Sequence, residues 1–163
     1  MSELASKTQL QQLTEFLLSG MQPFVTANSI DAWQDGGTLI LSGEDLGMGY
    51  QVAKWKHNAV ILIENFPHHQ VAPYNLLAML AAFLLDSGWP RDEYGLQDPT
   101  LDIDIISKDN ATIVIEVQLM DDIDLIPDDA GPVRFNGNRY NVALVPVNVA
   151  ESIDAQVVPG GAE

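Results

Sequence analysis

The sequence contains no cysteine and few basic residues, and each scarcity removes a class of function. Without cysteine the chain has neither a disulfide framework nor thiolate chemistry. Lysine and arginine together number 7 against 23 aspartate and glutamate residues, which gives a formal net charge of −16. So few dispersed cations do not make a nucleic-acid footprint, and the negative surface repels DNA and anionic membranes. The acid excess indicates either solubility alone or a surface that lies near DNA without adhering to it.

The sequence motifs of common enzymes are also missing. There is no Gly-x-Ser-x-Gly elbow, no phosphate-cradling glycine loop, and no zinc-ligand spacing around the only histidines. We interpret His57, His68 and His69 as residues of surface loops. We therefore expect no enzymatic activity, no catalytic residue, no cofactor and no metal ion.

Length and chain ends predict a single α+β domain over residues 1–150. Residues 151–163 lose all pattern and end in Pro-Gly-Gly-Ala-Glu, so we expect a disordered C-terminal tail. The first four residues lack the basic and apolar regions of a signal peptide, and we expect folding in a cytosol. No apolar run reaches the roughly 20 residues that a bilayer requires, which argues against a membrane protein.

Residues 73–87 are predicted to form the central helix. Pro73 fits a first helical position, Gly88 fits the residue after the end, and Pro90 prevents the helix from resuming. Every residue from 76 to 85 is apolar, which leaves no face for water. We expect a sheet to cover this helix on one side and another helix or a second subunit to cover the other.

The rest of the chain predicts a helix and several strands. Residues 6–18 have an amphipathic helical pattern that Gly20 ends, and residues 21–37 resemble a loop. A short strand is expected at 38–41 and a long bent strand at 50–63, whose segment 59–63 is continuously apolar, as in a strand buried on both faces.

The clearest hairpin pattern follows the central helix. Strict alternation at 101–105 and 113–119 flanks the turn-forming residues 107–110. A further strand is expected at 123–126, broken by Pro127, and Asn136-Gly137 predicts a small hairpin over 133–145. These elements favour a mostly antiparallel or mixed β-sheet packed by two helices.

The alternation places the carboxylates of the predicted hairpin on one face. Asp102, Asp104 and Glu116 project to one side of the sheet and the apolar side chains to the other. With Asp121, Asp122 and Asp124 they form an acidic series that could bind a hard cation, but no calcium-type loop accompanies it. We interpret the series as the solvated face of an antiparallel sheet.

Two tryptophans have separate interpretations. Trp89, just after the central helix, is expected to cover the core. Trp55 lies among Lys54, Lys56 and His57, where a large aromatic residue beside basic groups is typical of a protein interface; partial burial is the alternative.

The order of these elements resembles the tail completion protein R family of contractile-tailed temperate phages and prophages. The segments that carry the likeness are residues 58–66, 76–85 and 105–115, within a similarity that covers residues 10–124. Residues 120–124, Met-Asp-Asp-Ile-Asp, depart from the Thr-Glu-Arg-like ending that the family pattern leads us to expect.

The resemblance implies a non-enzymatic tail terminator. Such a protein caps the head-proximal end of the tail tube, stops its polymerisation and forms the surface on which the head docks. It implies a compact α/β subunit in a homo-oligomeric ring, commonly a hexamer, in contact with tail-tube and head–tail connector proteins. Assembly would occur in the host bacterial cytoplasm, and the protein would then belong to the virion tail. A negatively charged lumen would let DNA pass without adhesion, and Asp102, Asp104 and Glu116 are the candidates to line it.

Two hypotheses from other classes stay open at this point. The first is an acidic DNA mimic, or another protein-binding module, that occupies a basic partner. The second is a divalent-metal enzyme that uses the acidic hairpin.

Overall fold

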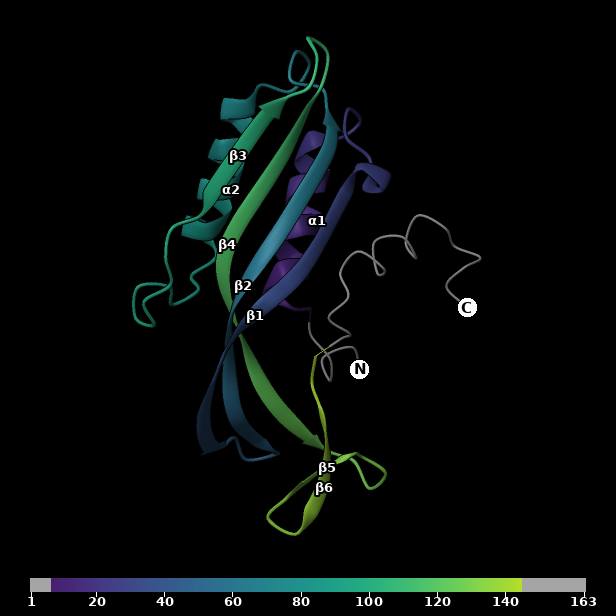
Figure 1. The fold of residues 1–163 in the computed structure, drawn as a ribbon. Coiled ribbons are helices and arrows are strands. Elements are labelled where there is room, and N and C mark those ends of the chain that lie inside the picture. The colour runs from purple at the N-terminus through teal and green to yellow at the C-terminus, as the bar shows by residue number, and fades with distance from the viewer. Residues whose placement is uncertain (1–6, 145–163) are drawn as a thin grey trace.

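Two helices pack on one face of an antiparallel sheet in the computed structural model, which describes residues 7–144 (Figure 1). The elements are α1 (Gln9–Met21), the short 3₁₀ turn η2 (Ala27–Ser29), β1 (Ile30–Asp45), β2 (Tyr50–Phe66), α2 (Pro73–Asp86), β3 (Thr100–Ile105), β4 (Ala111–Pro127), β5 (Val133–Phe135) and β6 (Asn138–Val142). The predicted α+β class with two helices is confirmed, and the described sheet is antiparallel throughout.

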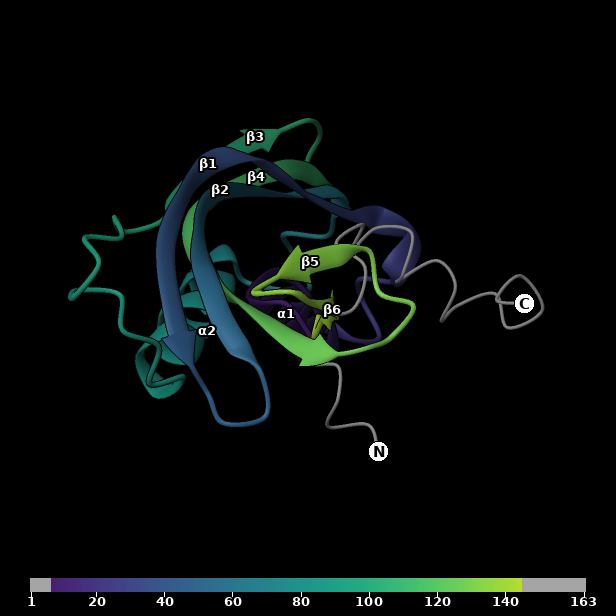
Figure 2. The same cartoon turned by 90° about the horizontal axis from the view of Figure 1, so that it is seen from below.

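The sheet is elongated and curled. Its strand order is β1-β2-β4-β6-β5, and β3 also pairs with β4. Near the helices the strands run β1-β2-β4-β3, whereas at the far end of β4 the neighbour is β6. We call the part beyond the helices, residues 38–53 and 123–142, the distal end (Figure 1). Figure 2 shows how strongly β1 and β2 curve along their length.

Helix α1 begins later than the amphipathic pattern predicts. Thr8 is the N-cap: its hydroxyl accepts from the backbone N–H of Gln11, and the Gln11 side chain accepts from the N–H of Thr8. This capping box sets the start at Gln9 rather than at residue 6. Gly20 does not end the helix, which continues to Met21 because Met21 packs into the core with 1% exposure.

Helix α2 begins at Pro73 as predicted and ends at Asp86, one residue earlier than expected, because Ser87 is its C-cap. The outer side of the helix remains open. Leu76, Leu80 and Leu84 are buried against the sheet. Helix α1 covers one flank, where the ring centroids of Phe16 and Phe83 are 4.8 Å apart. The expected second cover is therefore partly supplied by α1. Exposed apolar residues, among them Leu85 at 83% exposure, lie on the outer side.

Strand β1 is much longer than the sequence pattern indicates. It takes in residues 30–37, which we interpreted as loop, because Ile30 and Ala32 pair with Ile63 and Ile61 of β2. Irregularities between Gln34 and Gly37 absorb the Asp-Gly-Gly sequence without ending the strand.

Strand β2 confirms the long bent strand but not its burial on both faces. Ala59, Ile61 and Ile63 are fully buried under the helices, whereas Val60 and Leu62 are only half-buried on the opposite side. We call the side that carries the helices the helix face and the other side the open face.

Both predicted hairpins are present. Strands β3 and β4 pair from Thr100 opposite Glu116 to Ile105 opposite Ala111. Residues 123–126 are not a separate strand but the continuation of β4, which ends at Pro127. In the small hairpin, Asn136 and Gly137 both have positive φ, 51° and 81°, as the two-residue turn between β5 and β6 requires. The expected C-terminal tail at 151–163 lies outside the described residues.

Candidate functional site

The three acidic residues singled out from the sequence lie together on the open face. Asp102 is opposite Val114 and Asp104 opposite Thr112, while Glu116 is opposite Thr100. Cross-strand partners share a face, and the neighbouring positions Ile113 and Ile115 are buried in the core on the helix face. Asp102, Asp104 and Glu116 are therefore on one side, all exposed, and none makes an ion pair with a described residue. Whether they face a lumen stays a prediction.

This acidic face has an apolar centre. Val60, Leu62 and Val114 are half-buried between the carboxylates, and Trp33, opposite Val60, is 40% exposed. An acidic margin around a partly exposed apolar strip is the composition of an interaction surface rather than of a fully solvated sheet face.

The acidic series is not one continuous face, contrary to our interpretation. Asp121 is 5% exposed and lies on the helix face, where its Oδ1 accepts from the backbone N–H of Gln9, at 2.8 Å. Asp122 is half-exposed and pairs with Lys54 at 2.7 Å. Although partial burial by itself lowers it, the hydrogen bond and charge of Asp122 raise the pKa of Lys54. Within residues 7–144, no group of three His, Asp or Glu side chains has the proximity that a metal site needs.

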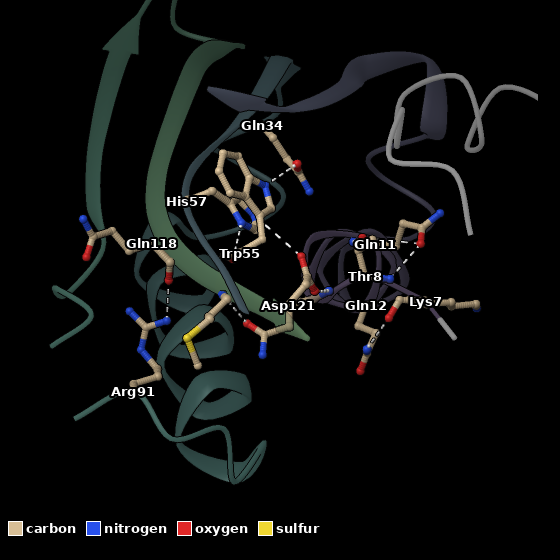
Figure 3. Close-up of polar contacts among 12 residues, drawn as sticks. Lys7, Thr8, Gln11, Gln12, Gln34, Trp55, His57, Arg91, Gln118 and Asp121 are labelled. Atoms are coloured by element: carbon tan, nitrogen blue, oxygen red, sulfur yellow. Dashed lines mark hydrogen bonds and ion pairs between the residues drawn. The ribbon is translucent and has the colours of Figure 1, made fainter. Parts of the chain in front are cut away.

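His57 is a core residue and not part of a surface loop. It lies on β2 with 1% exposure, and its Nδ1 is 3.1 Å from the carbonyl oxygen of Trp55 (Figure 3). A carbonyl oxygen can only accept, so Nδ1 carries the proton and Nε2 faces Asp121 Oδ2 at 3.9 Å. Neither Nε2 nor Oδ2 has a hydrogen-bond partner. Burial lowers the pKa of His57 and raises the pKa of Asp121, because each charged form is desolvated.

Trp55 lies on the helix face beside this pair, away from the lysines next to it in sequence. Its ring stacks on His57 with centroids 5.7 Å apart, and its Nε1 donates to Gln34 Oε1 at 2.9 Å (Figure 3). The side chain is half-buried, as the alternative interpretation holds, and an interface role for Trp55 stays a prediction.

The buried polar group joins α1 to β4. Gln9 contributes twice: its N–H donates to Asp121, and its Oε1 accepts from the N–H of Met120 at 3.0 Å. A carboxylate at the first turn of a helix is also favoured by the helix dipole. The sequence pattern does not reveal this contact, because it joins residues 112 positions apart.

The loop after α2 is held to the edge of β4 just before β3 begins. The Arg91 guanidinium donates to the carbonyl oxygens of Gln118, at 2.6 Å, and Gln97, at 2.7 Å. Trp89 packs partly buried against the core, with its ring edge-to-face on Phe83, as the sequence predicts. The loop therefore fixes the side of the open face next to Glu116.

The comparisons with known proteins assign the family. The family model of the P2 phage tail completion protein R (GpR) matches residues 7–144. The chain belongs to this family. The match runs over every described helix and strand, which confirms the resemblance found from the sequence.

A curated relative supports a phage origin. The chain is 25% identical over 148 residues to the "Uncharacterized 19.2 kDa protein in rep-hol intergenic region" of Haemophilus phage HP1 (strain HP1c1), an alignment that covers 90% of this chain and 89% of that protein. No solved structure matches. As a member of the GpR family, the chain has a structural role in a phage tail, which implies contact with other tail components. No helix in residues 7–144 has the length and apolarity to cross a membrane.

Proposed function

We propose that this GpR-family protein is the tail terminator of a contractile-tailed phage or prophage. It caps the head-proximal end of the tail tube, stops tube polymerisation and presents the surface on which the head docks. The observation that carries the proposal is the family match over residues 7–144, which takes in the acidic open face as well as the core. The protein acts by binding other proteins and not by catalysis.

The assembly that we propose is a homo-oligomeric ring, with a hexamer as the expected form. Its neighbours are the tail-tube and head–tail connector proteins. The protein assembles in the host bacterial cytoplasm and remains in the virion tail. The acidic open face supports a lumen that lets DNA pass, because exposed carboxylates such as Asp102, Asp104 and Glu116 repel phosphates.

Deletion of the gene from its parent phage or prophage tests this function. We expect tails of abnormal length, or tails without heads, in electron micrographs of induced lysates, and normal particles when the gene is supplied in trans. Particles with normal tails and attached heads after deletion would contradict the proposal. Deletion of a gene for an acidic DNA mimic or a metal enzyme would leave particle morphology normal.

A further inference from the structure

The β5–β6 hairpin at the distal end carries an arginine pair that has no acidic partner among the described residues. Arg134 and Arg139 are directly opposite each other in the register. The next positions, Phe135 and Tyr140, pack on Tyr50, so the two arginines project from the other side of the hairpin, and both are exposed. Within residues 7–144 the Arg134 side chain makes no hydrogen bond or ion pair, and Arg139 Nη1 donates to the carbonyl oxygen of Gly131, at 3.1 Å.

The hairpin is the electrostatic exception in an acidic chain. Residues 132–142 contain two of the seven basic residues and no aspartate or glutamate. Like charges directly opposite each other destabilise a strand pair. Two adjacent arginines on a small projecting hairpin therefore fit an anionic partner that would bind both and relieve their repulsion.

The complementary surface exists on the same chain but at the other end. Asp102 and Asp104 lie on β3, beside the helices, whereas β5 and β6 lie at the distal end (Figure 1). One molecule cannot bring the two surfaces together without refolding the sheet, so the contact must join two copies.

Exposed apolar residues accompany both surfaces. Leu41 and Met48 are 78% and 82% exposed at the distal end, and Trp33, which is 40% exposed, lies with half-buried Val60 in the centre of the acidic open face. A contact between the two ends can thus combine an apolar centre with charged margins, as stable interfaces do.

We propose that the β5–β6 hairpin of one copy binds the acidic open face of a second copy, with Arg134 and Arg139 against Asp102, Asp104 and Glu116. The two surfaces are different, so the contact is head-to-tail, and repetition closes a ring or extends a filament. The proposal deepens the proposed function, since it rests on ring formation and names the surfaces that build the ring. It gives Asp102, Asp104 and Glu116 a role between copies in place of the lumen-lining role, and the repulsion of DNA in the lumen then rests on the net charge of −16. A duplex DNA partner for the arginines is less favoured, because a net charge of −16 opposes its approach.

Charge-reversal variants of the full chain test the contact by sedimentation velocity. Arg134→Glu/Arg139→Glu, called the arm variant here, and Asp102→Lys/Asp104→Lys, the face variant, should each sediment as a monomer at concentrations where the unaltered protein assembles. Like charges juxtaposed in the interface should weaken association about 100-fold or more. In an equimolar mixture, each altered surface meets an oppositely charged one on the other variant, so alternating assembly should return. Matched controls are Lys108→Glu and Asp86→Lys/Glu93→Lys, which reverse exposed charges that make no ion pair with a described residue and should assemble normally.

Each other outcome overturns the contact. The contact is wrong if either variant alone assembles at the concentration at which the unaltered protein assembles, or if the mixture fails to assemble. It is also wrong if the unaltered protein is a monomer at about 100 µM, well above the micromolar range of ordinary specific association. Binding of labelled duplex DNA that the arm variant loses while it assembles normally would instead assign the arginines to DNA.

The outcome for the proposed function is read separately. Complementation of the deleted gene by the unaltered protein tests the terminator role, whatever surfaces join the copies. If each variant assembles normally on its own and the unaltered protein complements the deletion, the contact is wrong and the terminator function stands.

Discussion

Asp121 on β4 accepts a hydrogen bond from the first backbone N–H of α1 and at the same time faces the unprotonated nitrogen of His57 on β2. One carboxylate therefore links three elements at the point where the sheet leaves the helices. Its Oδ1 is satisfied, whereas its Oδ2 and His57 Nε2 are buried 3.9 Å apart with no other partner. Both side chains of this pair are buried, so we expect the stability of the protein to depend on pH.

Replacement of Asp121 by Asn should change the pH dependence of unfolding. Burial raises the pKa of Asp121 in the folded protein above its ordinary 3.8, so the folded state binds this proton more tightly than the unfolded state does. The resulting stabilisation is complete below pH 3.8 and is lost as pH rises through the raised pKa. The pKa of His57 is lowered below 6.5, and loss of the Asp121 charge lowers it further, which costs the variant stability at acid pH. Both effects make the unaltered protein lose stability relative to the variant as pH rises. The free energy of unfolding of the unaltered protein minus that of Asp121→Asn should decrease as pH rises from 3.8, the ordinary pKa of Asp, to 6.5, that of His.

Urea titrations at each pH measure this difference, with Asp109→Asn as the control because Asp109 is exposed in the β3–β4 turn and makes no ion pair with a described residue. A difference that stays constant or grows with pH would contradict the linkage. In Asp121→Ala, the N–H of Gln9 also loses its acceptor, and we expect a loss of about 1–3 kcal/mol.

The sequence predicts elements where one local pattern dominates and misses them where a distant partner decides. The wholly apolar run from 76 to 85 and the strict alternation at 101–105 each permit one structure, and both predictions are right. The first half of β1 was missed because Asp31, Asp35 and Gly36 are turn-formers, and only pairing with β2 makes them a strand.

The candidate site divides in the same way. Alternation alone is enough to place Asp102, Asp104 and Glu116 on one face. It is not enough for Asp121, because three consecutive residues, Leu119, Met120 and Asp121, are buried where the α1 N-terminus meets β4. Burial at that point is a property of helix docking, which no strand pattern contains.

Truncation of two leucines of α2 should change stability by very different amounts. Leu76 is fully buried in the core, and Leu76→Ala should cost about 2–5 kcal/mol. Leu85 is 83% exposed, and Leu85→Ala should stay within about 0.5 kcal/mol. Chemical denaturation at a concentration that keeps the protein monomeric measures both. A loss at Leu85 comparable to that at Leu76 would mean that the outer side of α2 is covered in the folded monomer.

A methyl group at Gly37 should disturb the irregular pairing of β1 with β2. A Cβ there would lie 2.1 Å from the backbone oxygen of Lys56 and 2.5 Å from the Cα of His57, so backbone must move. We expect Gly37→Ala to destabilise the protein by about 1–3 kcal/mol. The control is Gly20→Ala, where the nearest atom is the sulfur of the flexible Met79 side chain and alanine favours the helix. Thermal unfolding compares the two variants. An equal loss of stability in both would mean that the close approach of the backbone at Gly37 does not require glycine.

A single charge reversal in the β5–β6 hairpin should stabilise the monomer while it weakens assembly. Arg134→Glu puts a carboxylate directly opposite Arg139 and replaces a repulsive cross-strand pair by an attractive one, a gain of about 0.2–1 kcal/mol. Hydrogen exchange of the amides of residues 133–142 should slow in the monomer, because the gain is local to this hairpin. Loss of Arg134 from the arginine pair should also raise the concentration at which the protein assembles. Arg134→Gln, which removes the repulsion without adding attraction, should lie between the two proteins in exchange rate. Faster exchange in Arg134→Glu than in the unaltered chain would show that the arginines do not repel each other across the strands.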